Sequence, residues 1–405
     1  MRIGIIGTGV AGSVLLESLQ AAPGLLAEGF DRAAPGELEQ GGTGLNLCPN
    51  ALKSLRLHLP VRHAALRAAS LEWRRWTTRL ADGTRLADLD LLEVAEEPGA
   101  KLRWSELYRL LRAPVAGRTR HNHALAALEE DARGRLVPVF ETAAGLARHG
   151  AFDLLVAGDG RYSRLRALTA GEPVPSHANI GMSRLLVPDA ADAPLDDYGQ
   201  WFNGNARLLA YRLPGDAAYI AGAFPLGEDG ALTEAMRGPD WPARAYLPAH
   251  GAPCAAVAWM VAAMARLAGE MHWARVQVAP LERSALGGRV LFLGDAAHAM
   301  FPTLGQGATQ AIEDGAVAGA VLRAGGDAAA IGAWRDARVE FVRRFSEEAT
   351  DSMLPGADPV ALGRDKAGPA FRQRLRQLYT DVPGPGEIGA RPSGRSGVLA
   401  AARSG

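Results

Sequence analysis

A carboxylate, an imidazole and a glycine-rich helix start lie close together in the last third of the sequence. An apolar run at residues 290–293 ends in a Gly-Asp pair, which places Asp295 at the end of an expected strand. His298 and Pro302 follow, and a Gly-Gln-Gly turn at 305–307 then begins an alanine-rich helical pattern. An imidazole titrates near neutrality and can move a proton, while a helix start favours an anionic group. His298 is therefore either catalytic or hydrogen-bonded within the fold.

A second glycine cluster, GTGVAG at residues 7–12, has the spacing G-x-G-x-x-G between an expected strand and an expected helix. Gly7 permits a tight turn, Gly9 lets a pyrophosphate approach the backbone, and Gly12 lets the helix and strand pack closely. Asp31 ends the next expected strand, where an acidic side chain accepts hydrogen bonds from a ribose. The predicted dinucleotide contacts are Gly7, Gly9, Val10, Ala11, Gly12 and Asp31.

The strands that must position these residues share one pattern. Residues 2–7, 152–160 and 289–295 are apolar runs that end in glycine or Gly-Asp. With the helical pattern that follows residue 9, they predict an α/β fold, a Rossmann-like domain with a parallel sheet. Ligands bind at the carboxyl ends of such strands, so Asp159 is expected beside Asp295 and the first glycine loop.

Two further segments alternate between apolar and polar residues, which is typical of antiparallel strands. They predict a substrate domain of mostly antiparallel β-sheet, inserted into the first domain. The expected boundaries are 1–70, 98–175 and 279–345 for the dinucleotide-binding domain, 71–97 and 176–278 for the substrate domain, and 346–380 for C-terminal helices. Residues 381–405 are rich in Gly, Pro, Ser, Ala and Arg, which predicts a disordered tail.

The composition restricts the possible partners. The 405 residues have a net charge of +0, which gives no reason to expect nucleic acid or an anionic membrane surface. No apolar run is long enough to span a bilayer, and the two isolated cysteines fit a reducing cytoplasm. No spacing of His, Cys, Asp and Glu suggests a metal. We expect a cytoplasmic monomer or homodimer without stable membrane association.

Four ordered motifs resemble those of the FAD-dependent aromatic-ring hydroxylases, single-component flavin monooxygenases typified by para-hydroxybenzoate and salicylate hydroxylases. The motifs are residues 7–12 with Asp31-Arg32, residues 42–50, residues 159–166 and residues 294–307. One departure concerns an arginine that contacts FAD in the family. Arg103 is its candidate, but Trp104 has the register of that arginine with the leucines that follow. This variant is similar to the hydroxypyridine-hydroxylating relatives.

The resemblance implies FAD, NADH or NADPH, and O2, with a small hydroxylated aromatic or N-heteroaromatic substrate oxygenated through a flavin C4a-hydroperoxide. It also implies that Asp295 binds the ribityl chain, that Pro302 borders the reacting ring, and that the helix after Gly305 points at the flavin. The implied cofactor contacts are Arg32, Gly44, Leu45, Arg103, Asp159, Asp295, Gly305, Gln306, Gly307 and Ala308. A non-oxygenating FAD-dependent oxidoreductase and a flavin-dependent halogenase are the alternatives.

The substrate pocket is expected between the flavin and the antiparallel domain. Tyr211 could orient a substrate hydroxyl and act in catalysis with Pro302 and His298, while Arg184 or Arg212 could hold a carboxylate. Phe202 and Trp201 are aromatic candidates for the same wall. Each of these side chains has an ordinary structural alternative, as a core aromatic residue or a solvated arginine.

Overall fold

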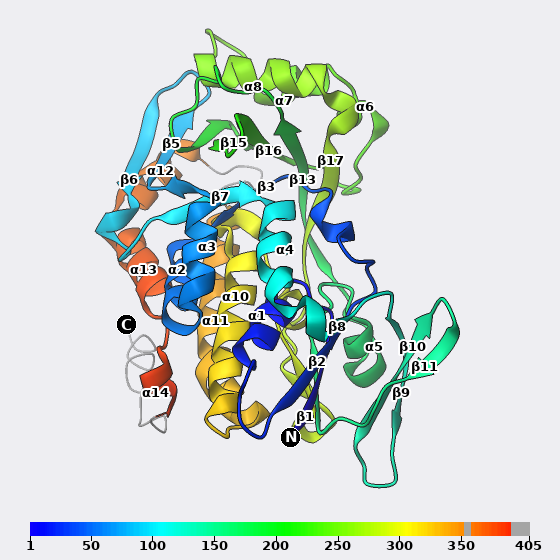
Figure 1. Ribbon diagram of the computed structural model, residues 1–405. Helices are drawn as coiled ribbons and strands as arrows, with labels where there is room; N and C mark the ends of the chain where they lie inside the picture. Colours follow the sequence, from blue (N-terminus) through cyan, green and yellow to red (C-terminus); the bar gives the residue numbers. More distant parts are fainter. Residues whose placement is uncertain (352–357, 390–405) are drawn as a thin grey trace.

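The nucleotide-binding half of the protein is built on a six-stranded, largely parallel sheet (Figure 1). The computed structural model describes residues 1–351 and 358–389. The strands run in the order β18 (Ser284–Ala285), β19 (Val290–Phe292), β12 (Leu154–Ala157), β1 (Arg2–Ile6), β2 (Leu26–Phe30) and β8 (Thr119–Arg120). From β19 to β8 all neighbours are parallel. Their apolar runs do not alternate because both faces of this sheet are covered.

Helices cover one face of this sheet, and a small antiparallel sheet covers the other. The helices are α1 (Val10–Ser18), α2 (Pro49–His58), α3 (Pro60–Ala68), α4 (Trp104–Arg112), α10 (Gln306–Arg323) and α11 (Ala328–Thr350). In Figure 1, α1 lies against the long helix α10, and the two share one buried core with β1. The opposite face packs on β9 (Ala124–Glu130) and β10 (Leu136–Thr142), beside β11 (Gly145–Arg148) and α5 (Arg164–Ala170).

The substrate half contains a seven-stranded sheet. Its order is β17 (His272–Val278), β13 (Ser176–Val187), β16 (Ala217–Pro225), β15 (Ala206–Leu213), β14 (Tyr198–Asn203), β5 (Arg75–Leu80) and β6 (Arg85–Asp90). Every neighbouring pair is antiparallel except β14 with β5. A three-stranded sheet of β3 (Gly44–Leu47), β7 (Gly99–Arg103) and β4 (Leu71–Trp73) lies below it in Figure 1. The predicted α/β fold with an inserted, mostly antiparallel sheet is confirmed.

The two faces of the seven-stranded sheet have different neighbours. Helices α6 (Glu234–Arg237), α7 (Trp241–Tyr246) and α8 (Ala255–Arg266) lie over the outer face, at the top of Figure 1. On β15, Leu208 and Ala210 pack in the core that contains α8. Leu209 and Tyr211 alternate with them and point to the inner face. Side chains of the inner face are therefore available to a site between the two halves.

The C-terminal region adds α9 (Asp295–His298) before α10, and α12 (Pro359–Ala367), α13 (Pro369–Thr380) and α14 (Pro385–Gly389) after α11. The prediction of a disordered tail is wrong for residues 381–389. His58 Nε2 lies 2.9 Å from the carbonyl oxygen of Pro383, and Ile388 is buried in the main core, so this segment is held by the body of the protein. Residues 390–405 lie outside the described residues. Within residues 1–351 and 358–389, no helix is long and apolar enough to cross a membrane.

Candidate FAD and substrate site

One cavity of about 1050 Å³ joins the two halves of the protein. It runs from the carboxyl ends of β1, β2, β12 and β19 to the inner face of the seven-stranded sheet. The predicted residues that line it are Gly7, Gly9, Val10, Ala11, Asp31, Arg32, Gly44, Leu45, Asp159, Arg184, Tyr211, Asp295, Pro302, Gly305, Gly307 and Ala308. Gly12, Arg103, Phe202, Arg212, His298 and Gln306 are outside its lining.

The first glycine loop has the backbone that its spacing predicts. Gly7 has φ +88°, and a Cβ there would lie 2.5 Å from the Cα of Asp159. At Gly9 a Cβ would meet no protein atom closer than 3.7 Å, so this position opens onto the cavity. A Cβ at Gly12 would lie 2.0 Å from the carbonyl oxygen of Gly7. Gly7 and Gly12 are therefore required by the protein itself, whereas the space beside Gly9 is free for a ligand.

Asp31 is held rigidly at the end of β2. Its Oδ2 accepts hydrogen bonds from the backbone N–H and the hydroxyl of Thr8, and its Oδ1 accepts one from Ala33 N–H at 2.9 Å. Arg112 Nη2 lies 3.8 Å from Oδ2 of Asp31. A carboxylate offers about four lone-pair sites, so Oδ1 keeps one for a further donor. A ribose hydroxyl could therefore donate a hydrogen bond to Oδ1 of Asp31.

A second glycine turn faces the same cavity from the other side. Gly305 adopts the left-handed conformation (φ +66°) and is the N-cap of α10, an 18-residue helix. The first N–H groups of α10 lie at the positive end of its dipole and suit an anionic or carbonyl oxygen. Asp295 begins α9 with its side chain 38% exposed, 3.9 Å from Arg161. Both ends of an elongated cofactor therefore have polar contacts in one cavity.

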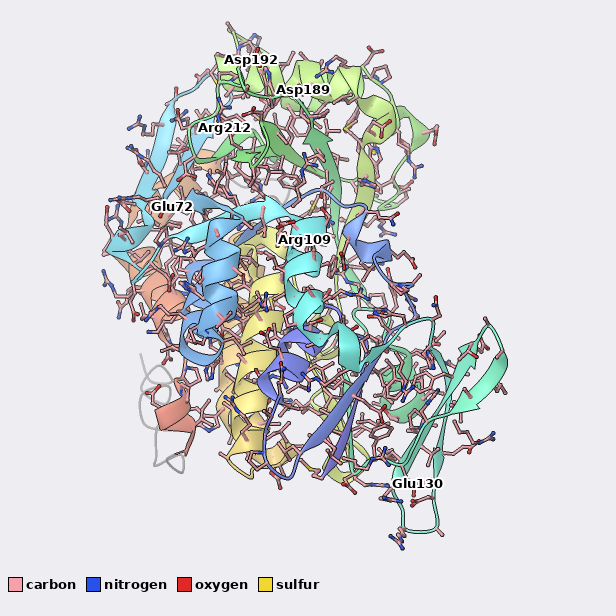
Figure 2. All side chains as sticks on the ribbon, in the orientation of Figure 1. Glu72, Arg109, Glu130, Asp189, Asp192 and Arg212 are labelled. Atoms are coloured by element: carbon pink, nitrogen blue, oxygen red, sulfur yellow. The ribbon has the colours of Figure 1, made fainter. Side chains whose placement is uncertain are left out.

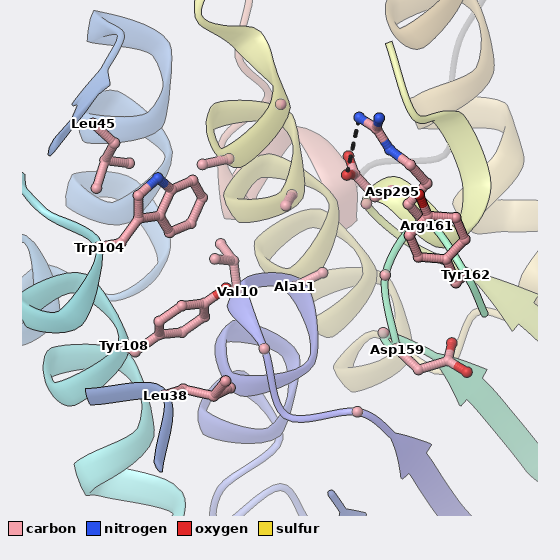
Figure 3. Close-up of a pocket in the computed structure, with 18 of the residues that line it drawn as sticks. Val10, Ala11, Leu38, Leu45, Trp104, Tyr108, Asp159, Arg161, Tyr162 and Asp295 are labelled. Carbon is pink, nitrogen blue, oxygen red and sulfur yellow. Dashed lines mark ion pairs between the residues drawn. The ribbon is translucent and has the colours of Figure 1, made fainter. Parts of the chain in front are cut away.

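Aromatic side chains of α4 form the wall opposite Arg161. Figure 3 shows Trp104 and Tyr108 near Val10 at the start of α1, with Arg161 and Asp159 on the other side. Arg103 is the N-cap residue of α4 and lies outside the cavity lining, so its contact with the cofactor stays a prediction. The extended backbone that ends β7 at Arg103 directs the next side chain, Trp104, to the cavity.

His298 is not at the cavity. It is 1% exposed, and its Nε2 lies 2.7 Å from Oδ2 of Asp314, which also accepts a hydrogen bond from Gly294 N–H. Arg335 Nε lies 2.7 Å from the other oxygen of Asp314. Burial opposes ionisation of Asp314, but Arg335 and His298 outweigh it and lower the pKa of this carboxyl. The catalytic prediction for His298 is therefore wrong. The cluster instead fixes the turn that presents Asp295.

Asp159 has a mixed role. Its Oδ2 accepts hydrogen bonds from the N–H groups of Arg164 (2.8 Å) and Leu165 (3.3 Å), which ties down the start of α5. Burial raises the pKa of this carboxyl. Among the described residues, Oδ1 is buried without a partner, so it can accept a hydrogen bond from a ligand in the cavity. Arg166, at the end of the same motif, bonds the carbonyls of Ala296 and Pro280 and is structural.

Three tyrosines line the substrate end of the cavity. Tyr198, Tyr211 and Tyr219 are direct neighbours on β14, β15 and β16, with ring centroids 5.5 and 5.1 Å apart. Burial raises the pKa of all three phenols. They consequently stay protonated at neutral pH. The hydroxyl of Tyr211 is buried and has no partner in the described part of the chain, so it is free to donate to a substrate.

Arg207 also lines the cavity, although no sequence motif indicated it. It is 6% exposed, and its Nε and Nη1 find no acceptor among residues 1–351 and 358–389. Burial lowers its pKa, but a guanidinium remains protonated in proteins. Strict alternation on β15 would have found it, because Arg207 and Tyr211 are four residues apart and share a face. Such an unpaired buried cation suits an anionic group of the substrate.

Arg212 and Phe202, two predicted substrate contacts, do not reach the cavity. Arg212 directly follows Tyr211 in the strand and points to the other face. It donates to the carbonyls of Ala190 (3.0 Å) and Ala191 (2.9 Å), and Figure 2 shows it near Asp189 and Asp192, above the sheet. Phe202 has Lys366 of α12 over its ring, with Nζ 5.6 Å from the centroid. Both predictions are corrected.

Trp201 and Gln306, two further candidates, also lie outside the cavity lining. Trp201 packs in the outer core with α8. Gln306 is fully buried, where its side-chain oxygen accepts a hydrogen bond from Asn50 at 3.0 Å. Both side chains therefore hold elements together, while a contact between the backbone N–H of Gln306 and the cofactor stays a prediction.

The fold and the cavity fit an FAD-binding protein whose antiparallel domain closes the far end of the cavity. The open space at Gly9, the remaining acceptor capacity of Asp31 and the two helix starts fit the pyrophosphate, ribose and flavin of FAD. A protein-family model described as "FAD binding domain" matches residues 270–344. That match covers Asp295 and the Gly305 turn, which form the C-terminal half of the predicted cofactor site, but not the first glycine loop.

Curated relatives match over most of their length. The 3-amino-4-hydroxybenzoate 2-monooxygenase of Streptomyces platensis is 30% identical over 338 residues, 77% of each chain. The 6-hydroxynicotinate 3-monooxygenase of Bordetella bronchiseptica is 25% identical, over 87% of this chain and 91% of its own. Klebsiella pneumoniae HpxO, solved with FAD and uric acid, has the same fold, with a TM-score of 0.73 at 22% identity over 97% of both chains.

The chain belongs to the family of FAD-dependent aromatic-ring hydroxylases. It is therefore a flavoprotein monooxygenase that uses FAD, NAD(P)H and O2. The predicted family, enzyme class and cofactors are confirmed.

Proposed function

We propose that the protein hydroxylates a small aromatic or N-heteroaromatic ring that carries both a hydroxyl group and a carboxylate. The observation that supports this most directly is the unpaired, buried guanidinium of Arg207 beside the three tyrosines of the cavity. A buried charge is costly without a partner, and a planar carboxylate is the partner that a guanidinium fits best. The named substrates of the two relatives, 3-amino-4-hydroxybenzoate and 6-hydroxynicotinate, have this chemistry.

The residues of the chain divide the work along the cavity. Gly9 and Asp31 would hold the pyrophosphate and ribose of FAD, and Asp295 and the start of α10 would hold its ribityl chain and flavin. When bound, FAD accepts electrons from NAD(P)H and supplies one oxygen atom of O2 to the ring. Pro302, with its fixed φ, borders the place where the ring must lie.

The substrate itself is positioned by the sheet. The hydroxyl of Tyr211 would donate to the ring hydroxyl, which orients the ring carbon to be attacked. Arg207, with Arg184 at the same wall, would hold the carboxylate. Met182, Leu209 and Met300 line the cavity with apolar surface, which keeps water from the reacting atoms.

The test is a screen of the yellow holoenzyme with NADH and NADPH. The panel contains 4-hydroxybenzoate, 3-amino-4-hydroxybenzoate, 6-hydroxynicotinate and the neutral amide of each. We expect substrate-dependent O2 uptake and a product heavier by one oxygen atom for at least one carboxylate, with little H2O2. Colourless protein that cannot be reconstituted with FAD, or oxidation of NAD(P)H that yields only H2O2 with every compound, would refute the proposal. A chlorinated product formed with chloride present would indicate a halogenase.

The two cysteines fit a reducing compartment. Cys48 and Cys254 are both free thiols, and Cys48 is buried among apolar residues, where it acts as a small hydrophobic side chain. We expect a cytoplasmic monomer or homodimer, and sedimentation of the purified holoenzyme distinguishes these two oligomeric states.

A further inference from the structure

Two buried basic side chains lie close together near the tyrosines, and one of them comes from the C-terminal helix α12. Arg207 of β15 faces Phe202 of β14 across the strand pair. Lys366 of α12 places its Nζ 5.6 Å from the centroid of the Phe202 ring, 5.5 Å from that of Trp76, and 3.5 Å from Oε1 of Gln200. Arg207 and Lys366 are each 6% exposed. Arg207 lines the cavity, and Lys366 lies behind it.

Arg207 and Lys366 have no carboxylate partner within the described residues, and neither side chain forms an ion pair there. The charged groups of the elements packed around α12 have other partners. Arg75 and Arg85 pair with Asp88, Arg74 with Asp90, Arg79 with Asp196, Arg372 with Glu93, and Arg374 with Glu348, while Arg376 donates to the carbonyl oxygen of Glu93. On α12 itself, Arg364 and Asp365 are exposed. Residues 352–357 and 390–405 contain no Asp or Glu.

The other buried lysine shows the contrast. Lys101 of β7 is 4% exposed and is paired with Asp197. Lys366 instead has an amide oxygen and two aromatic rings, which are weak partners for a charge. Burial and, next, the charge of Arg207 lower the pKa of Lys366 to about 7. The titratable groups that act on Arg207 from the neighbouring strands and α7 are the phenols of Tyr198, Tyr219 and Tyr246.

We propose that Lys366 is a specificity-determining residue, which takes up one proton from solvent when an aromatic carboxylate binds beside Arg207. The inference rests on the proposed carboxylate substrate and adds how the protein recognises its charge. With the cavity free of anions, the repulsion of Arg207 disfavours a second positive charge. A bound carboxylate offsets that repulsion and favours the ammonium form of Lys366. A neutral ring at the same place would not change this balance.

The pH dependence follows from linkage. Below about pH 7 the ammonium form already exists before the ligand binds, so no proton is taken up. Above it the unliganded Lys366 is mostly neutral, and binding must be accompanied by proton uptake. The affinity for carboxylates should therefore fall as the pH rises from 7 to 9, by at most about tenfold per pH unit for one linked proton. The affinity for the matching amides should not follow this trend.

Calorimetric titration of the holoenzyme measures the proton directly. At about pH 8, 4-hydroxybenzoate and 6-hydroxynicotinate are titrated in phosphate and in Tris, whose ionisation enthalpies differ. We expect uptake of up to about one proton per carboxylate bound by the wild type, and none with 4-hydroxybenzamide. Lys366→Met should abolish the uptake and flatten the pH dependence of Kd. Lys53→Met, which alters a lysine paired with Glu96 away from the cavity, is the matched control and should behave as the wild type.

A second measurement does not depend on the variant folding. The chain has three lysines, so labelling with 15N-lysine gives three side-chain signals that can be followed between pH 6 and 10. One of them should titrate near pH 7 in the unliganded holoenzyme and at a higher pH with 4-hydroxybenzoate bound. Three lysines that all titrate near 10, or a carboxylate that binds without proton uptake, would overturn the inference. So would failure of every aromatic carboxylate in the panel to bind.

Failure of this inference is distinct from failure of the proposed function. Proton-linked binding of a carboxylate without oxygenation would leave the role of Lys366 intact and refute the monooxygenase substrate class. Oxygenation of carboxylates with binding that is independent of pH would do the reverse.

Discussion

Replacing Gly9 and Gly7 separately by alanine should separate ligand binding from folding in the first glycine loop. Gly9 has φ −71°, outside the left-handed region that favours glycine, and its added Cβ would be in ordinary contact with the carbonyl oxygen of Gly158 at 3.7 Å. An alanine at an unstrained position changes the free energy of unfolding by less than about 1 kcal/mol. The Gly9→Ala apoprotein should therefore unfold within about 2 °C of the wild type. The methyl group would, however, occupy the space that a pyrophosphate needs.

The effect of Gly9→Ala on FAD can be estimated as overpacking. Forcing a methyl group into a filled site costs about 1–3 kcal/mol, which corresponds to a Kd weaker by roughly fivefold to 150-fold. Gly7→Ala differs in kind, because φ is +88° and the Cβ would lie 2.5 Å from backbone. Left-handed strain and this contact together should destabilise the apoprotein by about 2–5 kcal/mol.

The assay uses apoprotein prepared by removing FAD. Circular dichroism gives Tm, and quenching of flavin fluorescence on titration gives Kd. Gly9→Ala should lose affinity at nearly unchanged Tm, while Gly7→Ala should lose several degrees before any FAD is added. Wild-type FAD affinity in Gly9→Ala would refute the placement of the pyrophosphate. Equal loss of Tm in both variants would refute the distinction between the two glycines.

Three further variants test the rest of the site. Tyr211→Phe should lower kcat/KM about tenfold to a hundredfold without lowering Tm, because it removes a buried hydroxyl that has no partner within the described protein; a value within twofold of wild type would contradict this. Arg212→Ala should leave kcat/KM within about twofold and lower Tm, since Arg212 holds backbone carbonyls outside the cavity; a large loss of activity at unchanged Tm would argue for a substrate role. Asp314→Asn should lower the free energy of unfolding in urea by about 3–5 kcal/mol, because His298 and Arg335 lose their buried counterion. Because the pKa of Asp314 is lower in the folded than in the unfolded protein (about 3.9), its carboxylate stabilises the fold above pH 3.9, and this stability is lost as the pH falls through the folded-state pKa. The Asn variant should therefore lose less stability on acidification. The same loss of stability at low pH in both proteins would contradict this.

The strands and glycine turns of the cofactor half could be predicted because their signals are local. An apolar run that ends in glycine specifies a buried strand and the turn after it, and the geometry of parallel sheets then brings Asp31, Asp159 and Asp295 to one edge. Each of these three side chains lines the cavity. The residues of a turn are therefore enough to predict its backbone conformation and the side chains next to it.

The substrate end was harder because its contacts depend on what covers the sheet. Alternation alone could have excluded Arg212 and selected Arg207, since both lie in the same strand as Tyr211. It could not have excluded Phe202, which has the right face but is covered by Lys366 from α12. Helix α12 follows β14 by more than a hundred residues, so the sequence around Phe202 gives no indication that this helix covers it.

His298 shows the same limit for a polar residue. Its partner Asp314 is in α10, and Arg335, the other charge of the cluster, is in α11. The spacing along the sequence does not correspond to any single helix face or strand, so the cluster forms only when the helices pack. A histidine that follows a Gly-Asp turn invites a catalytic interpretation, and tertiary packing decides against it.

The strand order also determines when the protein can become functional during synthesis. Ile5 of β1 pairs with Val156 of β12, and Val156 pairs with Leu291 of β19. The six-stranded sheet therefore cannot be completed until β19 has been synthesised, when nearly three quarters of the chain has left the ribosome. Until then β12 exposes an unpaired edge. Such long-range pairing slows folding, so expression at low temperature or with chaperones should raise the yield of yellow protein. A fragment that stops before β19 would carry the dinucleotide loop without the strand that delivers Asp295.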